Sequence, residues 1–150
     1  MSMDKFEKID ALLEKPYWLI DLLPKQVPAG SHGQYFEIEQ HFLSQLDTLC
    51  QKFFAILVKL NCYFDIQANF NGEDWTLNPT PENLESLMNS AVTLHSPIYI
   101  LIGSEDALVT FSGDDHYMTL YNPDTELLEL VRLLASSEGL FVWSPYQKNP

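Results

Sequence analysis

Apolar residues recur at intervals of three and four along residues 31–60, which is the spacing of one face of an α-helix. The stripe consists of Tyr35, Ile38, Phe42, Leu46, Leu49, Phe53, Ile56, Leu57 and Leu60. Residues 53–58 are apolar on every side and should be buried. Ser31 stands three residues before Gln34, the spacing of a capping box at a helix start. We therefore predict one long central helix from Ser31 to Leu60, against which the rest of the chain packs.

Strand patterns lie on both sides of this helix. Residues 62–70 alternate strictly, with apolar Phe64 and Ile66 on one face and polar Asp65 and Gln67 on the other. Because one face of such a strand is wet, the pattern favours a mixed or largely antiparallel sheet over a doubly covered parallel one. Five further segments have β-type apolar runs bounded by turn residues: residues 17–23, 98–102, 107–111, 116–121 and 140–143.

Shorter helices are predicted at residues 4–14, after a Thr80 cap with Pro81 in the first helical position, and after Asp124. Residues 71–79 are predicted to be a loop, and residues 144–150 a frayed tail. The predicted fold is a single α+β domain over residues 1–150. It has a mixed or largely antiparallel sheet of about five to six strands, one long central helix, and two or three shorter helices mainly on one face.

Composition limits the class of protein. With 150 residues, 46% of them hydrophobic, the chain can build a core without disulfides or metals. Its apolar runs are far shorter than the roughly 20 residues that span a bilayer, so we expect a cytoplasmic protein with no membrane partner. Cys50 and Cys62 belong to no Cys-x-x-Cys pair, and both are expected to be reduced core residues. No metal or other cofactor is predicted.

Charge is the most unusual property of the sequence. The formal net charge is −13, and no Lys or Arg lies between Lys59 and Arg132, an interval that holds more than half of the 21 acidic residues. Such a field repels phosphate backbones and attracts basic proteins, so nucleic acid is not an expected partner and a basic protein is. The alternative is that these acids simply keep the protein soluble.

The polar face of the predicted sheet is the first candidate site. If its strands pair as expected, tyrosines and short polar side chains share this face, and tyrosine suits protein recognition because it combines a large apolar area with a polar tip. The candidate partner-binding residues are Tyr63, Asp65, Gln67, Tyr99, Tyr117 and Tyr121, with Thr110 and Thr119 beside them. The alternative is that the N-terminal helix or a loop covers this face.

The loop before the long helix is the second candidate site. The N-terminus of a helix offers free backbone N–H groups and the positive end of a dipole to an anion. Lys25, Ser31, His32 and Gly33 would form this anion-binding site. The turn has no Gly-x-Gly-x-x-Gly or Walker motif, and Gly30 beside a capping Ser also suits an ordinary helix start.

Evidence for chemistry is weaker. Glu37 and His41 lie four residues apart and with Asp114, Asp115 or His116 would make a His/carboxylate metal site, but no established metal-ligand spacing is present. The alternative is a solvated helix pair and a hairpin turn. His95 is interpreted as a turn residue, and no nucleophile elbow occurs. No catalytic residues or metal ligands are therefore predicted, and an enzyme is the less favoured class.

The function expected from the sequence is that of a small acidic protein-interaction module. It would bind, and in one form inhibit or neutralise, a basic protein partner. The alternative is a small-anion-binding domain or enzyme with its site at the loop from Lys25 to Gly33.

Overall fold

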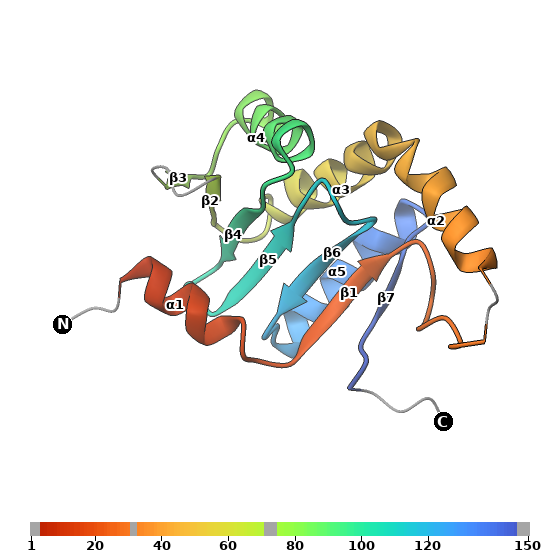
Figure 1. Ribbon diagram of the computed structural model, residues 1–150. Helices are drawn as coiled ribbons and strands as arrows, with labels where there is room; N and C mark the ends of the chain where they lie inside the picture. Colours follow the sequence, from red (N-terminus) through yellow and green to blue (C-terminus); the bar gives the residue numbers. More distant parts are fainter. Residues whose placement is uncertain (1–3, 31–32, 71–74, 147–150) are drawn as a thin grey trace.

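The computed structural model describes residues 4–30, 33–70 and 75–146. Within these residues, one antiparallel sheet has seven strands in the order β3-β2-β4-β5-β6-β1-β7 (Figure 1). The strands are β1 Tyr17–Asp21, β2 Ile66–Phe70, β3 Thr76–Leu77, β4 Ile98–Ile102, β5 Ala107–Phe111, β6 Tyr117–Tyr121 and β7 Phe141–Trp143. The helices are α1 Lys5–Leu12, α2 Gln34–Leu43, α3 Leu46–Leu60, α4 Pro81–Leu94 and α5 Thr125–Ser137.

The predicted α+β class and largely antiparallel sheet are confirmed. The strand count was too low, because β3 lies in the segment predicted to be a loop and pairs with β2 through Gln67 and Leu77. A strand of two residues is too short to show an alternating pattern. Strand β2 also begins later than predicted, so Tyr63 and Asp65 precede the sheet.

The single long helix is a wrong prediction, because the chain bends between α2 and α3. Gln45 leaves helical geometry with φ −113° and ψ 31°, and its backbone N–H donates to the carbonyl of Phe42 rather than that of His41. The Ser44 hydroxyl donates to the carbonyl of His41, a side-chain bond that competes with the helix ladder. The apolar spacing continues across the bend, so the sequence pattern does not reveal it.

The predicted start of the helix is also corrected. Helix α2 begins at Gln34 and has Gly33 as its N-cap, with φ +88° and no side-chain cap. Glycine suits this left-handed position because it has no Cβ. Ser31 lies outside the described residues, so its predicted capping bond is untested. The Thr80 and Asp124 caps are confirmed, since their side chains accept from the backbone N–H groups of Asn83 and Leu127.

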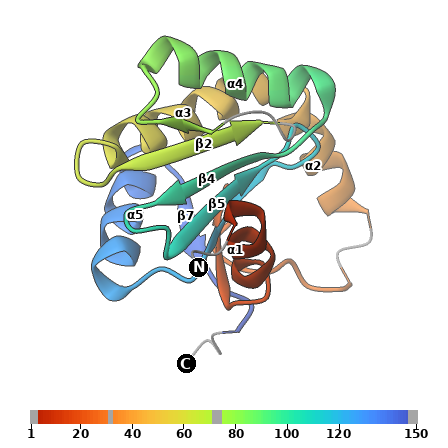
Figure 2. The same ribbon diagram turned by 90° about the vertical axis from the view of Figure 1, so that its left-hand side faces the viewer.

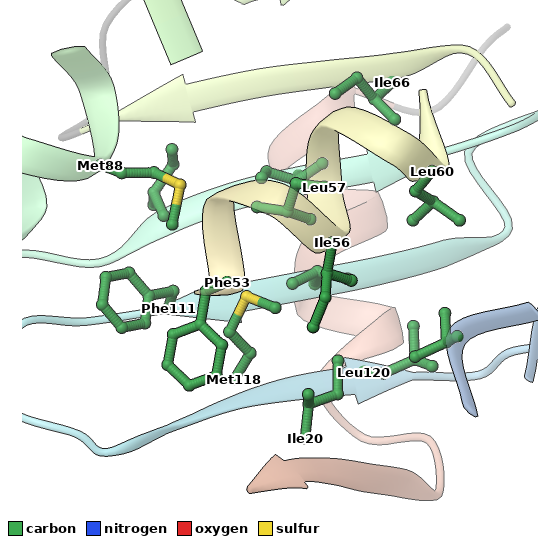
Figure 3. Packing of buried hydrophobic residues seen from close by; sticks show 14 of the residues in the cluster. Ile20, Phe53, Ile56, Leu57, Leu60, Ile66, Met88, Phe111, Met118 and Leu120 are labelled. Carbon is green, nitrogen blue, oxygen red and sulfur yellow. The ribbon is translucent and has the colours of Figure 1, made fainter. Parts of the chain in front are cut away.

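The main core lies between the sheet and helices α3, α4 and α5 (Figure 1). Phe53 of α3 is fully buried and packs edge-on against Phe111 of β5 with ring centroids 5.4 Å apart (Figure 3). This core includes the apolar side chains Ile66 of β2, Ile98, Ile100 and Ile102 of β4, and Met118 and Leu120 of β6.

Helix α1 lies on the opposite face of the sheet, over β4 and β5 (Figure 2). Ile9 and Leu12 pack there against Leu101 and Leu108 in a second, smaller cluster. Lys8 donates to Glu105 in the turn between β4 and β5, which fixes the other side of the helix. The alternative in which the N-terminal helix covers part of this face therefore holds.

Three smaller expectations have different outcomes. Cys50 is buried as predicted, whereas Cys62 is exposed, because it lies in the turn after α3 rather than in a strand. Ser144, where the tail was expected to begin, is buried and donates to the carbonyl of Tyr17. Among the described residues, no helix combines the length and apolar character needed to cross a membrane.

Candidate functional sites

The predicted tyrosine face is partly covered by α1. Tyr63 and Asp65 lie in the turn before β2, where Asp65 accepts a hydrogen bond from the side chain of Asn78. Gln67 donates to Glu105, and Tyr99 packs against the cluster under α1. Tyr121 packs against the same small cluster as Tyr99, so α1 lies over both of these tyrosines.

Further tyrosines lie on this face along β6 and β1. Tyr121 packs against Tyr17 with ring centroids 5.6 Å apart, and Tyr17 packs edge-on against Tyr146. Tyr117 lies at the opposite end of β6, beside His116. Burial raises the pKa values of Tyr117 and Tyr121, so both stay protonated at neutral pH.

A groove of about 670 Å³ runs between α3 and α4. Its apolar floor is formed by Cys50 and Phe54 of α3 with Met88 and Val92 of α4, two pairs spaced four residues apart. Residues at this spacing lie on one helix face, so each helix presents two apolar side chains to the groove. Gln51 and Asn89 line the groove beside them.

The charge of this groove is one-sided. Asp47 and Glu85 line it, and none of the described residues in its lining is Lys or Arg. Burial together with these two carboxylates raises the pKa of the Cys50 thiol to about 11. The lysines of α3 lie toward α5 instead: Lys59 pairs with Glu138 at 3.4 Å, and Lys52 approaches Gly139. Cations are thus confined to the other side of α3.

A second cavity, of about 440 Å³, lies between the loop at residues 22–29 and the end of the sheet at β6, β1 and β7. Leu19, Val27 and Trp143 supply apolar walls, whereas Asp21 and His116 contribute buried polar groups. Lys25 is exposed and lines the same cavity.

His116 lies at the centre of a buried polar cluster formed by Asp21, Glu39 and Tyr35. Its Nδ1 is 3.3 Å from Asp21 Oδ1, and its Nε2 is 3.0 Å from Glu39 Oε2 and 2.9 Å from the Tyr35 hydroxyl. The Tyr35 hydroxyl also donates to Glu39 Oε2. Asp21 is held in place by the indole N–H of Trp143 and the backbone N–H of Leu22.

This arrangement favours the imidazolium form of His116. The Asp21 carboxylate is the largest cause of a raised His116 pKa, opposed by burial and assisted by Glu39. Burial and the bond to Glu39 raise the pKa of Tyr35 to about 12, so its hydroxyl stays protonated. Asp115 is adjacent, and burial and Asp114 raise its pKa. The cluster thus places one imidazole among at least two carboxylates.

The residues considered for a metal site, which the sequence did not support, are not brought together. Glu39 rather than Glu37 reaches His116, whereas Asp114 pairs with the exposed His95 at 2.8 Å. Within the described residues, no group of three His, Cys, Asp or Glu side chains has a metal-binding arrangement. Of the predicted anion site, Lys25 lines the cavity and Gly33 caps α2, while Ser31 and His32 lie outside the described residues.

Sequence reasoning did not identify Asp21, Glu39 or Trp143 as site residues. Asp21 is the one acid inside an apolar strand, where a charged residue needs a partner when buried. The sequence therefore showed that Asp21 needs a partner. It did not show which residue this is, because His116 lies 95 residues away and next to a different strand.

Comparisons with known proteins add no assignment. Neither a protein family, nor a curated protein, nor a solved structure matches this chain.

Proposed function

We propose that this protein is an interaction module that binds a basic protein partner in the groove between α3 and α4. The observation that carries the proposal is the combination of an apolar floor with acidic edges and no cation in the lining described above. An amphipathic segment bearing Lys or Arg beside apolar side chains matches this chemistry. The proposal places the protein in the cytoplasm, and inhibition of the partner is one form it takes.

The floor supplies the contact area. Phe54 and Val92 are partly exposed, so they remain available to a partner, whereas Cys50 and Met88 close the groove from below. An apolar side chain of the partner that enters the groove would be removed from water. The groove is already open, so this side chain would meet little steric hindrance. The spacing of four residues along each helix suits a partner that is itself helical.

The edges supply orientation and speed of association. Asp47 lies in the first turn of α3, and Glu85 lies in the second turn of α4. Both are exposed, so each would attract a cation through solvent and be sensitive to salt. The wider acidic surface adds a long-range attraction without adding specificity.

The tyrosine residues stay a predicted secondary surface. Tyr117 and Tyr121 lie on the face of β6 opposite to Met118 and Leu120, which pack toward the helix layer. A partner seated in the groove would not touch them, so the two surfaces are tested by separate variants.

The test uses a synthetic amphipathic peptide of Leu and Lys, and a second peptide with Lys replaced by Glu. We expect saturable binding of the basic peptide with amide shift changes confined to α3 and α4, and none with the acidic peptide. Glu85→Lys should weaken binding at low salt about threefold to tenfold. Val92→Ser should weaken it at every salt concentration, because it removes apolar contact.

Glu129→Lys is the matched control. It makes the same change in net charge on the exposed face of α5, away from the groove. If Glu129→Lys weakens binding as much as Glu85→Lys, the attraction is a property of the overall charge and the groove proposal is wrong. Binding that maps to the sheet face would transfer the function to the tyrosine surface.

A further inference from the structure

The cavity at residues 22–29 has a chemistry different from that of the groove, and Tyr35 of α2 belongs to its lining. Two features make it a built site rather than a surface depression. The side chains of Asp21 and His116 that line it are 5% and 8% exposed, and their orientation is fixed by Trp143, Leu22 and Glu39. Its volume of about 440 Å³ is within the range of small-molecule sites.

The buried end of the cavity favours a hydrogen-bond donor with positive charge. The two carboxylates of Asp21 and Glu39 outnumber the one imidazole of His116, so the cluster keeps an excess of negative charge even when that imidazole is protonated. Oδ1 of Asp21 accepts the Leu22 N–H and lies 3.3 Å from His116 Nδ1, whereas Oδ2 accepts the Trp143 N–H and can accept a second hydrogen bond. An ammonium group would supply both the donor and the charge.

The outer end favours an anion. Lys25 lines the cavity, is exposed, and has no ion-pair partner among the described residues. Its flexible four-carbon stem lets the ammonium group reach a carboxylate over the cavity mouth. The excess negative charge at Asp21 and Glu39 would repel a simple anion. A ligand that carries an ammonium group as well as an anionic group therefore fits Lys25 better than an anion alone.

The walls favour an apolar or aromatic substituent between these ends. Leu19, Val27 and Trp143 surround the cavity, and Tyr117 lies at its edge. The indole face and the apolar side chains would shield such a group from water.

We propose that this cavity binds a small zwitterion of the α-amino-acid class with an apolar side chain. Its ammonium group lies at Asp21, its carboxylate at Lys25, and its side chain against Trp143. The proposal is independent of the α3–α4 groove, since the two sites share no residue.

Three small ligands serve as probes that test the ammonium and carboxylate groups separately. L-Phenylalanine carries both, phenethylamine lacks the carboxylate, and 3-phenylpropionate lacks the ammonium. Binding is followed by calorimetry and by the indole N–H resonance of Trp143, assigned with Trp143→Phe, because that N–H donates to Asp21 at the cavity. We expect L-phenylalanine to bind most tightly, phenethylamine more weakly, and 3-phenylpropionate most weakly.

Lys25→Ala tests the outer end without disturbing a buried contact. It should reduce the affinity for L-phenylalanine about threefold to tenfold and leave that for phenethylamine unchanged. Lys15→Ala is the matched control, since Lys15 is exposed and lies outside the cavity lining. Failure of all three probes to saturate the protein at millimolar concentration would overturn the proposal, as would equal affinity for phenylalanine and phenethylamine in the parent.

Discussion

Nε2 of His116 lies 3.0 Å from Oε2 of Glu39, although 77 residues separate the two in the sequence. This contact joins α2 to the end of β6. It is important for α2 because no residue of that helix is buried, and Phe36 and Ile38 are 63% and 50% exposed. The position of α2 thus depends on the polar contacts of Tyr35 and Glu39 with His116 together with limited apolar packing on Leu22 and Leu23.

The His116 cluster predicts that stability falls above neutral pH. The pKa of His116 is raised in the folded protein, so its stabilising contribution is complete below the ordinary pKa of 6.5 and is lost as the pH rises through the folded value. The raised pKa of Asp115 also lowers stability as the pH rises, but it does so in the acid range that begins at its ordinary pKa of 3.8. Conversely, the lowered pKa of Glu105 gives stability that is lost below its ordinary pKa of 4.5. Maximum stability is therefore expected between pH 4.5 and 6.5.

Urea midpoints measured from pH 4 to 9 test this expectation. His116→Gln should flatten the decline above pH 6.5, whereas His95→Gln should not, because His95 and Asp114 form an exposed pair. A midpoint in the parent that is constant from pH 6.5 to 9 would contradict the assignment of a raised His116 pKa.

The close approach of Gly113 to α4 provides a separate test of how the loop between β5 and β6 is held. A Cβ added at Gly113 would lie 2.6 Å from Cα of Val92 and 2.8 Å from the carbonyl oxygen of Ala91, both backbone atoms of α4. Gly113→Ala should therefore destabilise the fold by about 1–3 kcal/mol, since backbone cannot yield as a side chain tip can. Gly30→Ala is the control, because no atom lies within 4 Å of its added Cβ. If the two variants have the same thermal unfolding midpoint, the loop lies farther from α4 than these distances indicate.

The elements that the sequence predicted well are those whose pattern reflects burial on one face. Strands β4 and β5 have the predicted bounds, and α4 begins after the predicted Thr80 cap. In these segments local propensity and the tertiary environment agree. The pattern also predicted which face of β4 meets the helices.

The bend between α2 and α3 could not be predicted in the same way. Tyr35, Phe42 and Leu49 keep helical spacing across the bend, yet Tyr35 contacts His116 and Leu49 enters the main core. The hydrophobic pattern records which residues are buried and not which neighbour buries them. The direction of α2 is instead set by contacts with residues distant in sequence.

The same limit applies to the two candidate sites. The α3–α4 groove unites residues of two helices separated by β2 and β3, and the cavity near α2 unites Asp21, His116 and Trp143 from three strand ends. The charge asymmetry was visible in the sequence, but the absence of cations from one side of α3 depends on Lys52 and Lys59 turning toward α5.

The burial of Phe53 predicts how much the main core contributes to the free energy of unfolding. Its side chain is fully buried and contacts Phe111 across the helix–sheet interface (Figure 3). Phe53→Ala should reduce the free energy of unfolding by about 3–5 kcal/mol, because it removes apolar contact and leaves a cavity. Phe36→Ala is a control of the same chemistry at an exposed position and should change stability by less than about 1 kcal/mol. Chemical denaturation measures both, and near-parental stability of Phe53→Ala would place this ring outside the core.

The packing of Ile9 predicts that α1 can detach from the sheet while the sheet stays folded. Ile9 and Leu12 belong to the small cluster with Leu101 and Leu108, which is separate from the main core. Ile9→Ala should therefore increase amide hydrogen exchange in α1 more than in β4, because the helix can open locally while the sheet stays protected by α3. The release would also uncover Tyr99 and Tyr121, which pack against this cluster. Equal acceleration of exchange in α1 and β4 would show instead that α1 and the sheet unfold as one cooperative unit.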